Sequence, residues 1–323
     1  MKKYVARRIA QLFVTYFAFI TLLFIIFRIA PGDPTSMYML EGMGPEQRQR
    51  VLAQLGVDRP LHEQYINYLV QLLSLDLGQS FRYREPVQNI IWYRFWNTIL
   101  LMGPAFFLAY VIGITVGAFM GWVRGSAKER FGIIMTLIAR SSPEFWIGLL
   151  LLMTFSFYLG WFPSGGMRET GYQAATFWDR YLSTNFLHHM FLPLLTGVIF
   201  YMATPALLMR SSMIQVLNSD FIEIKKAEGH PEYILLYKYA ARNSILPITT
   251  VVAIVVGVTL GGSLIIETVF NWPGMGREMV ESVNHNDYDM AQAVFFLMGS
   301  VVIFMNFVAD IVYVFLDPRV RYE

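Results

Sequence analysis

The segment Asp220-Phe-Ile-Glu-Ile-Lys-Lys-Ala-Glu-Gly229 is a short polar stretch between two long apolar runs. Its pattern predicts a brief helix with defined ends. Asp220 can cap the first turn, and Glu223 stands three residues later in the capping-box position. Gly229 suits the left-handed residue after a helix end, and Pro231 prevents the helix from continuing. A rigid polar helix outside an apolar bundle is suited to receive a mechanical input from a soluble partner.

The composition assigns the rest of the chain to the membrane. Of its 323 residues, 55% are hydrophobic and only 15% are charged. A soluble protein with so much exposed apolar surface would aggregate. A net charge of +2 is too small to favour nucleic acid as a partner. Because the chain has no cysteine, disulfides, thiol catalysis and cysteine-based metal sites are excluded.

Six apolar segments are long enough to cross a bilayer, whose core of about 30 Å needs roughly 20 apolar residues in a helix. They are predicted near 9–30, 98–122, 132–160, 187–213, 245–270 and 290–316. The first run is longer than the apolar core of a signal peptide, and no cleavage site follows it, so we expect a retained transmembrane helix. The predicted fold is an all-α polytopic membrane protein with about six transmembrane helices.

The distribution of lysine and arginine predicts the orientation of these helices. If the N-terminus is cytoplasmic, most basic residues of the short loops and tails share that side: Lys2, Lys3, Arg7, Arg8, Arg124, Lys128, Arg130, Lys225, Lys226, Lys238, Arg242, Arg319 and Arg321. Both termini are therefore predicted in the cytoplasm. We expect three parts: residues 1–30 with the first transmembrane helix, a helical extracytoplasmic insertion at 31–97, and a core transmembrane domain at 98–323 with a cytoplasmic loop at 214–244.

The segment Phe270-Asn-Trp-Pro-Gly-Met-Gly276 interrupts the apolar pattern before the last span. It is either a plain outer turn, for which Pro-Gly pairs are typical, or a short re-entrant element near the external mouth. Irregular backbone at membrane depth persists only where it is buried in protein or lines a water-filled cavity. We expect an external gate here, with Trp272 at the membrane–water interface. Its candidate residues are Trp272, Pro273, Gly274 and Gly276.

Four ionisable residues fall within predicted spans, where a charge is costly and marks a functional hypothesis. Arg140 and Glu144 are one turn apart and can form an ion pair, although Pro143 between them disturbs the helix. Glu267 and Asp310 fall near helix ends, so we expect them in solvated or snorkelled positions. The sequence shows no chain of such residues that would relay protons. It identifies no substrate-binding residue.

Three glycines, Gly113, Gly117 and Gly121, share one helix face at a spacing of four. Small residues let neighbouring membrane helices approach closely. We therefore expect tight helix packing at this stripe; the alternative is that it lines the substrate path.

Motifs for catalysis and nucleotide binding are missing from the chain. His62-Glu63 is not followed by the second histidine of a zinc-protease helix, and His188-His189 has no neighbouring carboxylate. The Gly-x-x-x-x-Gly-Lys loop that holds phosphates is absent. We expect no enzymatic activity, no catalytic residue, no metal and no cofactor in this chain, so any ATP-driven work comes from a partner.

Two segments around the polar helix, 223–229 and 241–247, resemble motifs of the permease subunits of ATP-binding-cassette (ABC) importers. Glu223 to Gly229 is similar to the family's Glu-Ala-Ala…Gly loop, which forms the coupling helix that docks into an ATPase subunit. Ala241-Arg-Asn-Ser-Ile-Leu-Pro247 resembles the form found in the oligopeptide, dipeptide and nickel branch. Ile224 and Lys225 depart from the family's two alanines, and Pro247 lies further from Gly229 than in the commonest importer pattern.

The resemblance covers nearly the whole chain. Six further segments occur in the family's order: 29–34, 55–61, 75–80, 142–148, 267–276 and 317–319. It implies a permease subunit of the first-permease type in the bacterial or archaeal cytoplasmic (inner) membrane. The implied ATPase-coupling residues are Asp220, Glu223, Lys225, Lys226, Ala227 and Gly229.

The resemblance also implies the partners and the cargo. The partners are a second homologous permease, two ATP-binding subunits that hold ATP and Mg²⁺, an extracytoplasmic substrate-binding protein and the lipid bilayer, but no nucleic acid. Peptides are the expected cargo, and the same architecture serves oligosaccharides or nickel. Two other classes remain as alternatives. An ion-coupled carrier would need inverted repeats and midplane charges, and an intramembrane enzyme would need a converging catalytic set; neither is evident.

Overall fold

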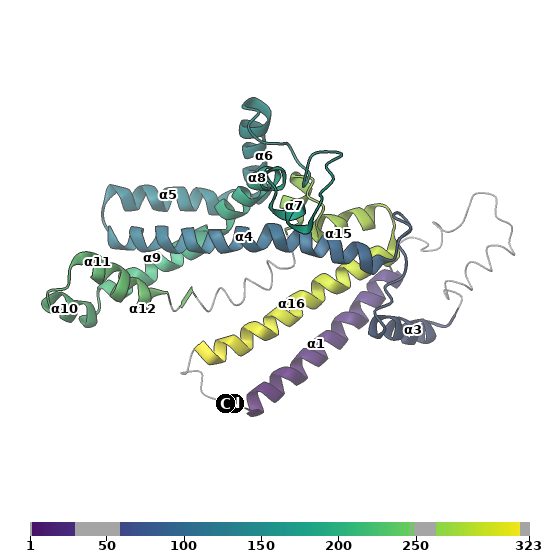
Figure 1. Ribbon diagram of the computed structural model, residues 1–323. Coiled ribbons are helices and arrows are strands. Elements are labelled where there is room, and N and C mark those ends of the chain that lie inside the picture. Colours follow the sequence, from purple (N-terminus) through teal and green to yellow (C-terminus); the bar gives the residue numbers. More distant parts are fainter. Residues whose placement is uncertain (1, 30–58, 246, 249–262, 317–323) are drawn as a thin grey trace.

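The computed structural model describes residues 2–29, 59–245, 247–248 and 263–316, and these parts are helical without a strand (Figure 1). Four helical segments in them are long and apolar enough to cross a membrane: Val5–Arg28, Val87–Trp122, Thr184–Leu217 and Tyr288–Ile311. A bent pair, Ala127–Ser141 with Glu144–Tyr158, can form a fifth span. The all-α, multi-span architecture is confirmed. The span predicted at 245–270 lies mostly outside the described residues, so the count of about six stays a prediction.

The centre of the molecule is α4 (Val87–Trp122), which packs along α8 (Thr184–Tyr201) and α9 (Ala203–Leu217). Helix α4 begins at Val87, directly after Pro86 and 11 residues before the start of the predicted span at 98–122. The glycine stripe makes this packing close: a Cβ on Gly113 would lie 2.6 Å from the Met202 carbonyl oxygen. A Cβ on Gly117 would overlap the Ala206 carbonyl oxygen. The predicted tight packing of this stripe is confirmed.

Helices α5 (Ala127–Ser141) and α6 (Glu144–Leu151) meet at a sharp break. Their axes differ by 104°, and α6 with the following η2 (Leu152–Tyr158) projects from the bundle at the top of Figure 1. Pro143 causes the break, because proline has no N–H to donate and disfavours a helical residue before it. The segment predicted at 132–160 is therefore a bent pair of helices, and the disturbance predicted at Pro143 is a complete break.

Helices α1 (Lys2–Ile29) and α16 (Tyr288–Leu316) run side by side as a separate pair. The hydroxyls of Tyr16 and Ser300 form a hydrogen bond of 2.8 Å between them. Asp310, predicted in a solvated or snorkelled position, is partly exposed and forms an ion pair with Arg8 at 2.8 Å.

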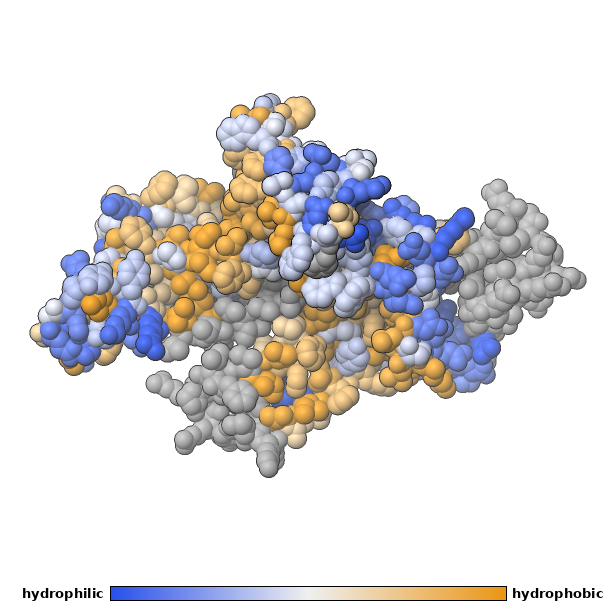
Figure 2. Space-filling model, in the orientation of Figure 1, coloured by the Kyte–Doolittle hydropathy of each residue, from blue (hydrophilic) through white to orange (hydrophobic). Residues whose placement is uncertain are grey.

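The polar elements gather at the two ends of the long axis of Figure 1. Helices α10 (Asp220–Ala227), α11 (Glu232–Ile234), η3 (Leu235–Ala241) and α12 (Arg242–Ser244) lie at the left end, where α4 turns into α5. Helices α3 (Leu61–Leu73) and α15 (Met275–Asn284) lie at the right end. Figure 2 shows polar residues at both ends and an apolar band between them. The loop at 214–244 and α3 of the insertion are thus at opposite ends; their sides of the membrane stay a prediction.

Candidate functional site

The first candidate site is α10 with the turn that follows it, here called the coupling segment (residues 220–231). The helix has the predicted position but not the predicted start. Ser219 is the N-cap residue, and its hydroxyl donates to the Val216 carbonyl oxygen at 2.6 Å instead of capping the helix. Asp220 and Glu223 lie in the first turn without a side-chain cap, so the predicted capping box is wrong. Both carboxylates still favour this helix end, because they oppose the positive end of its dipole.

The end of α10 follows the prediction. Gly229 adopts a left-handed backbone with φ of +79°, and its N–H donates to the Lys226 carbonyl oxygen at 3.0 Å. No atom lies near the position of a Cβ on Gly229, so the backbone conformation, and not the available space, selects glycine. Pro231 then precedes α11.

One buried side chain fixes α10 to the bundle. Ile222 is fully buried in a cluster with Met209 and Met213 of α9 and Ala240 of η3. The ring of Phe221 packs edge-on against Tyr239 with their centroids 5.9 Å apart. A displacement of α10 would therefore displace α9 and η3 with it, since a close-packed core does not deform locally.

The charges of the coupling segment are partly used within it. The Lys225 ammonium donates to Glu228 at 2.7 Å and lies 5.5 Å from the centre of the Tyr239 ring. The hydrogen bond lowers the pKa of Glu228 and raises the pKa of Lys225, so both stay charged near neutral pH. Lys225 is therefore turned back along its own segment. Asp220, Glu223, Ile224 and Ala227 are exposed along one face of α10, here called its outer face, and Phe221 and Lys226 are exposed beside it.

The second candidate site is the predicted gate segment, which connects α14 (Leu264–Val269) to α15. Trp272 is fully buried, its indole N–H donates to the Asn97 carbonyl oxygen at 2.9 Å, and its ring lies 5.7 Å from Phe186. The expectation that Trp272 faces the membrane–water interface is therefore wrong. The enrichment of tryptophan at membrane interfaces led to that expectation, but a buried hydrogen-bond acceptor satisfies the indole N–H equally well.

Glu267 is the polar centre of this segment. It is fully buried, accepts from the Thr98 hydroxyl at 2.6 Å and accepts from the Arg277 N–H at 2.9 Å. The expectation of a solvated or snorkelled Glu267 is wrong. A Cβ on Gly274 would overlap the Glu267 carboxylate, and one on Gly276 would lie 2.8 Å from the Leu264 backbone. The two glycines are therefore required because the chain folds tightly around this carboxylate.

A set of carboxylates ties residues 78–98 to residues 267–289. We call these two stretches together the external cap, after the side of the membrane predicted for them. Asp287 accepts from the Ser80 hydroxyl at 2.5 Å and from the Arg82 N–H at 3.2 Å. The remaining ties are the ion pairs Arg82–Glu281 (2.5 Å) and Arg94–Glu278 (3.1 Å) and the hydrogen bond Tyr83–Glu278 (3.1 Å). Burial raises the pKa of Glu278, although Arg94 opposes this. Sequence reasoning missed the cap, since its two stretches are far apart in the chain.

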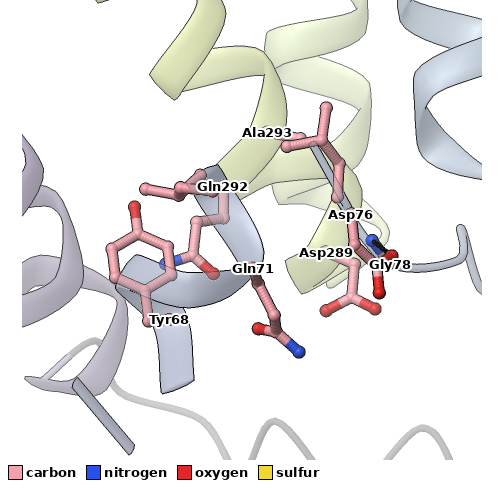
Figure 3. A pocket seen from close by; sticks show the side chains of 9 residues that line it. Tyr68, Gln71, Asp76, Gly78, Asp289, Gln292 and Ala293 are labelled. Atoms are coloured by element: carbon pink, nitrogen blue, oxygen red, sulfur yellow. Dashed lines mark hydrogen bonds between the residues drawn. The ribbon is translucent and has the colours of Figure 1, made fainter. Parts of the chain in front are cut away.

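A small pocket beside the cap shows how the insertion joins the last helix (Figure 3). Tyr68 and Gln71 of α3 face Asp289 and Gln292 of α16 across a volume of about 80 Å³. Gly78 closes one side, where a Cβ would lie 2.6 Å from a carboxylate oxygen of Asp289. This volume admits ordered water but not a peptide, so we interpret it as a structural joint.

Arg140 and Glu144 do not form the predicted ion pair. The break at Pro143 turns α6 away, and each residue has another partner. Arg140 donates to the Thr204 hydroxyl at 2.5 Å, and buried Glu144 accepts from the Ser263 hydroxyl at 3.1 Å. Each therefore connects the broken helix to a neighbouring helix.

Comparisons with known proteins agree over the full length. A model of the binding-protein-dependent transport system inner membrane component matches residues 113–322, and a model of the N-terminal part of such membrane components matches residues 1–102. The chain is 34% identical to an oligopeptide transport system permease protein of Bacillus subtilis over 324 residues, which cover 100% of each chain. It is 33% identical to a di/tripeptide transport system permease protein of Pseudomonas aeruginosa and 33% to a glutathione transport system permease protein of Salmonella typhimurium, with 100% of each chain covered.

Proposed function

The chain belongs to the family of binding-protein-dependent transport system inner membrane components, and we propose that it imports short peptides as one permease of an ABC transporter. Members of this family are ABC permeases and multi-pass membrane proteins. Peptide as cargo is supported by the relatives, whose names specify oligopeptides, di- and tripeptides, and glutathione. Each of these is a short peptide. Oligosaccharides and nickel are therefore not favoured.

The coupling segment carries the proposed mechanism. ATP and Mg²⁺ bind to two ATPase subunits, one of which contacts the exposed outer face of α10. Ile222 passes the resulting displacement to α9 and η3, because it is buried in one cluster with residues of both. Helix α9 passes it to α4 through the close contacts at Gly113 and Gly117. In this proposal both termini and the coupling segment face the cytoplasm, and no ATPase site belongs to this chain.

We propose that the external cap contains the gate of the pathway. Helix α4 links the two sites, because Asn97 and Thr98 in its first half form hydrogen bonds with Trp272 and Glu267. A shift of α4 therefore carries the gate segment with it. A second homologous permease forms the other half of the pathway, and an extracytoplasmic binding protein delivers the peptide to this end.

The cargo is tested by uptake into proteoliposomes that contain the assembled transporter. We expect ATP-dependent uptake of labelled di- and oligopeptides, and no uptake of labelled oligosaccharides or Ni²⁺ above background. Uptake of Ni²⁺ or oligosaccharide without peptide uptake would refute the peptide assignment and leave the permease assignment intact.

The coupling role is tested with Gly229→Val. Valine resists the left-handed backbone, so the turn after α10 is strained and α10 is misplaced. We expect peptide uptake and peptide-stimulated ATP hydrolysis to fall at least about tenfold. The matched control is Gly171→Val, which also has a positive φ (+87°) and open space around it but lies outside the coupling segment. Wild-type uptake by Gly229→Val would show that this turn does not couple the subunits.

A further inference from the structure

A hollow of about 620 Å³ lies behind the coupling segment, between the ends of α4 and α9 and the start of α11. Its apolar wall includes Trp122 and Leu217. These are the last residues of two candidate membrane spans, Val87–Trp122 and Thr184–Leu217. The hollow therefore lies at the level where both spans leave the apolar layer, and tryptophan is enriched at this level of membrane proteins.

The polar wall of the hollow is basic. Arg124 enters it from the turn after α4, Lys226 from α10, and His230 from the turn before α11. Within the described part of the chain, the side chains of Arg124 and Lys226 make no hydrogen bond and no short ion pair. Glu129, which already binds Arg210, acts on Arg124 only through its longer-range charge. Nearby cations do have such partners: Lys225 binds Glu228, and Arg210 binds Glu129 at 2.5 Å.

The negative charge that lines the hollow is smaller than the positive charge of Arg124 and Lys226. One carboxylate, Glu232, lies on the same wall, and Asn218 adds an amide. Leaving His230 aside, two cations face one anion. His230 is already engaged, since its ring nitrogen lies 3.2 Å from both Glu228 and the Tyr239 hydroxyl. The hollow thus keeps a net positive charge for a ligand.

We propose that this hollow binds the phosphate of an anionic phospholipid headgroup, with Arg124 and Lys226 as its cationic ligands. Basic pockets between helices at the cytoplasmic surface suit anionic headgroups, and the apolar wall at Trp122 and Leu217 suits the start of the acyl chains. Free inorganic phosphate shares the charge chemistry but would leave the apolar wall unused. The site does not depend on the peptide cargo.

The geometry separates this ligand from the ATPase partner. Ile224 and Ala227 are exposed on the outer face of α10 and do not line the hollow, whereas Lys226 does. In this proposal Lys226, which the resemblance assigned to the ATPase contact, faces the lipid instead, and the ATPase subunit contacts Ile224 and Ala227. A bound headgroup would brace α10 against the ends of α4 and α9, which makes coupling sensitive to anionic lipid.

The test is lipid binding by the assembled, purified transporter, measured by native mass spectrometry at low ionic strength. The probes are dioleoyl phosphatidylglycerol, dioleoyl phosphatidylcholine and inorganic phosphate. The variant is Arg124→Gln/Lys226→Gln. Its matched control, Arg130→Gln/Lys238→Gln, removes the same charge from the same two regions but outside the hollow. Peptide uptake by the wild type in phosphatidylcholine vesicles is measured separately, so that a failure of the transport proposal is recognised independently.

We expect about fivefold weaker phosphatidylglycerol binding per lost cation, and so about 25-fold for the variant, with no change for the control or for phosphatidylcholine. Glu232→Gln removes the opposing charge and should strengthen phosphatidylglycerol binding, a gain that a misfolded variant cannot mimic. Equal phosphatidylglycerol binding by variant and control would overturn the proposal. So would displacement of the lipid by millimolar inorganic phosphate. Loss of the ATPase subunits from the variant with lipid binding retained would also overturn it, by assigning the hollow to the partner protein.

Discussion

Glu267 illustrates how one carboxylate organises a turn at the residue scale. A buried charge is stable only with its hydrogen bonds made, and Glu267 accepts from the Thr98 hydroxyl and from a backbone N–H at the start of α15. The Thr98 hydroxyl in turn accepts from the Met275 N–H at 2.8 Å. The same carboxylate fills the space that a side chain at position 274 would need.

The first prediction concerns the contact between Gly274 and Glu267. Gly274 has an extended backbone (φ −105°, ψ −174°) that alanine also adopts, so Gly274→Ala should destabilise only through overlap with Glu267. We expect a cost of about 1–3 kcal/mol from Gly274→Ala. Glu267→Ala leaves two buried donors without an acceptor and should cost about 2–4 kcal/mol. The measurement is the thermal unfolding of the purified transporter for both single variants and the double variant.

The double variant decides the interpretation. With the Glu267 side chain truncated to a methyl group, the new methyl group at position 274 has room, so Gly274→Ala should cost much less than in the wild-type background. We expect a coupling energy of at least about 1 kcal/mol. Strictly additive costs would contradict the contact between position 274 and the Glu267 carboxylate.

At the scale of elements, the sequence predicted those features that depend on neighbouring residues. Gly229 and Pro231 end α10 where expected, because a positive φ and a missing N–H act locally. The glycine stripe on α4 was also readable, since its spacing repeats with the helix. The partners of Glu267 and Trp272 were not readable: Thr98 and Asn97 are 169 and 175 residues away in the chain, and only the tertiary fold brings them together.

The break between α5 and α6 shows that apolar composition does not predict whether a span is one straight helix. The apolar content of 132–160 predicted one helix, and Pro143 was recognised only as a disturbance. In the fold the backbone bends by 104° at Pro143, and Arg140 and Glu144 each bind a residue outside their own helix pair. The hydropathy pattern therefore predicted a segment long and apolar enough for the membrane but not its path.

The second prediction concerns the contact of α4 with α9. Gly117→Ala places a methyl group against the Ala206 carbonyl oxygen, and neither backbone can move without disturbing the central packing. We expect destabilisation by about 1–3 kcal/mol and reduced peptide uptake. The measurement is thermal unfolding together with uptake. The control is Gly103→Ala on the same helix, where no atom lies within 4 Å of the new methyl group and stability should be unchanged or slightly higher.

At the scale of the whole molecule, α4 connects the two candidate sites. Its 36 residues span about 54 Å as a helix. Asn97 and Thr98 bind the gate segment, and the contacts of Gly117 and Gly121 with α9 lie close to the coupling segment. A rigid rod held at both ends transmits a displacement only if each end moves as one body. The carboxylate ties of the external cap provide this rigidity at the far end.

The last prediction tests whether the external cap moves as one body. The chain has no cysteine, so Ser80→Cys/Asp287→Cys introduces a single pair at positions whose side chains are in hydrogen-bond contact. Oxidation would then lock residues 78–98 to the loop before α16. If the cap is rigid throughout transport, the oxidised transporter should take up peptide at the rate of the same sample after reduction. Mass spectrometry confirms the cross-link, and comparison within one sample removes any effect of the substitutions themselves. Uptake that is lost on oxidation and restored on reduction would mean that this joint opens in each cycle, and that the gate lies between the two halves of the cap.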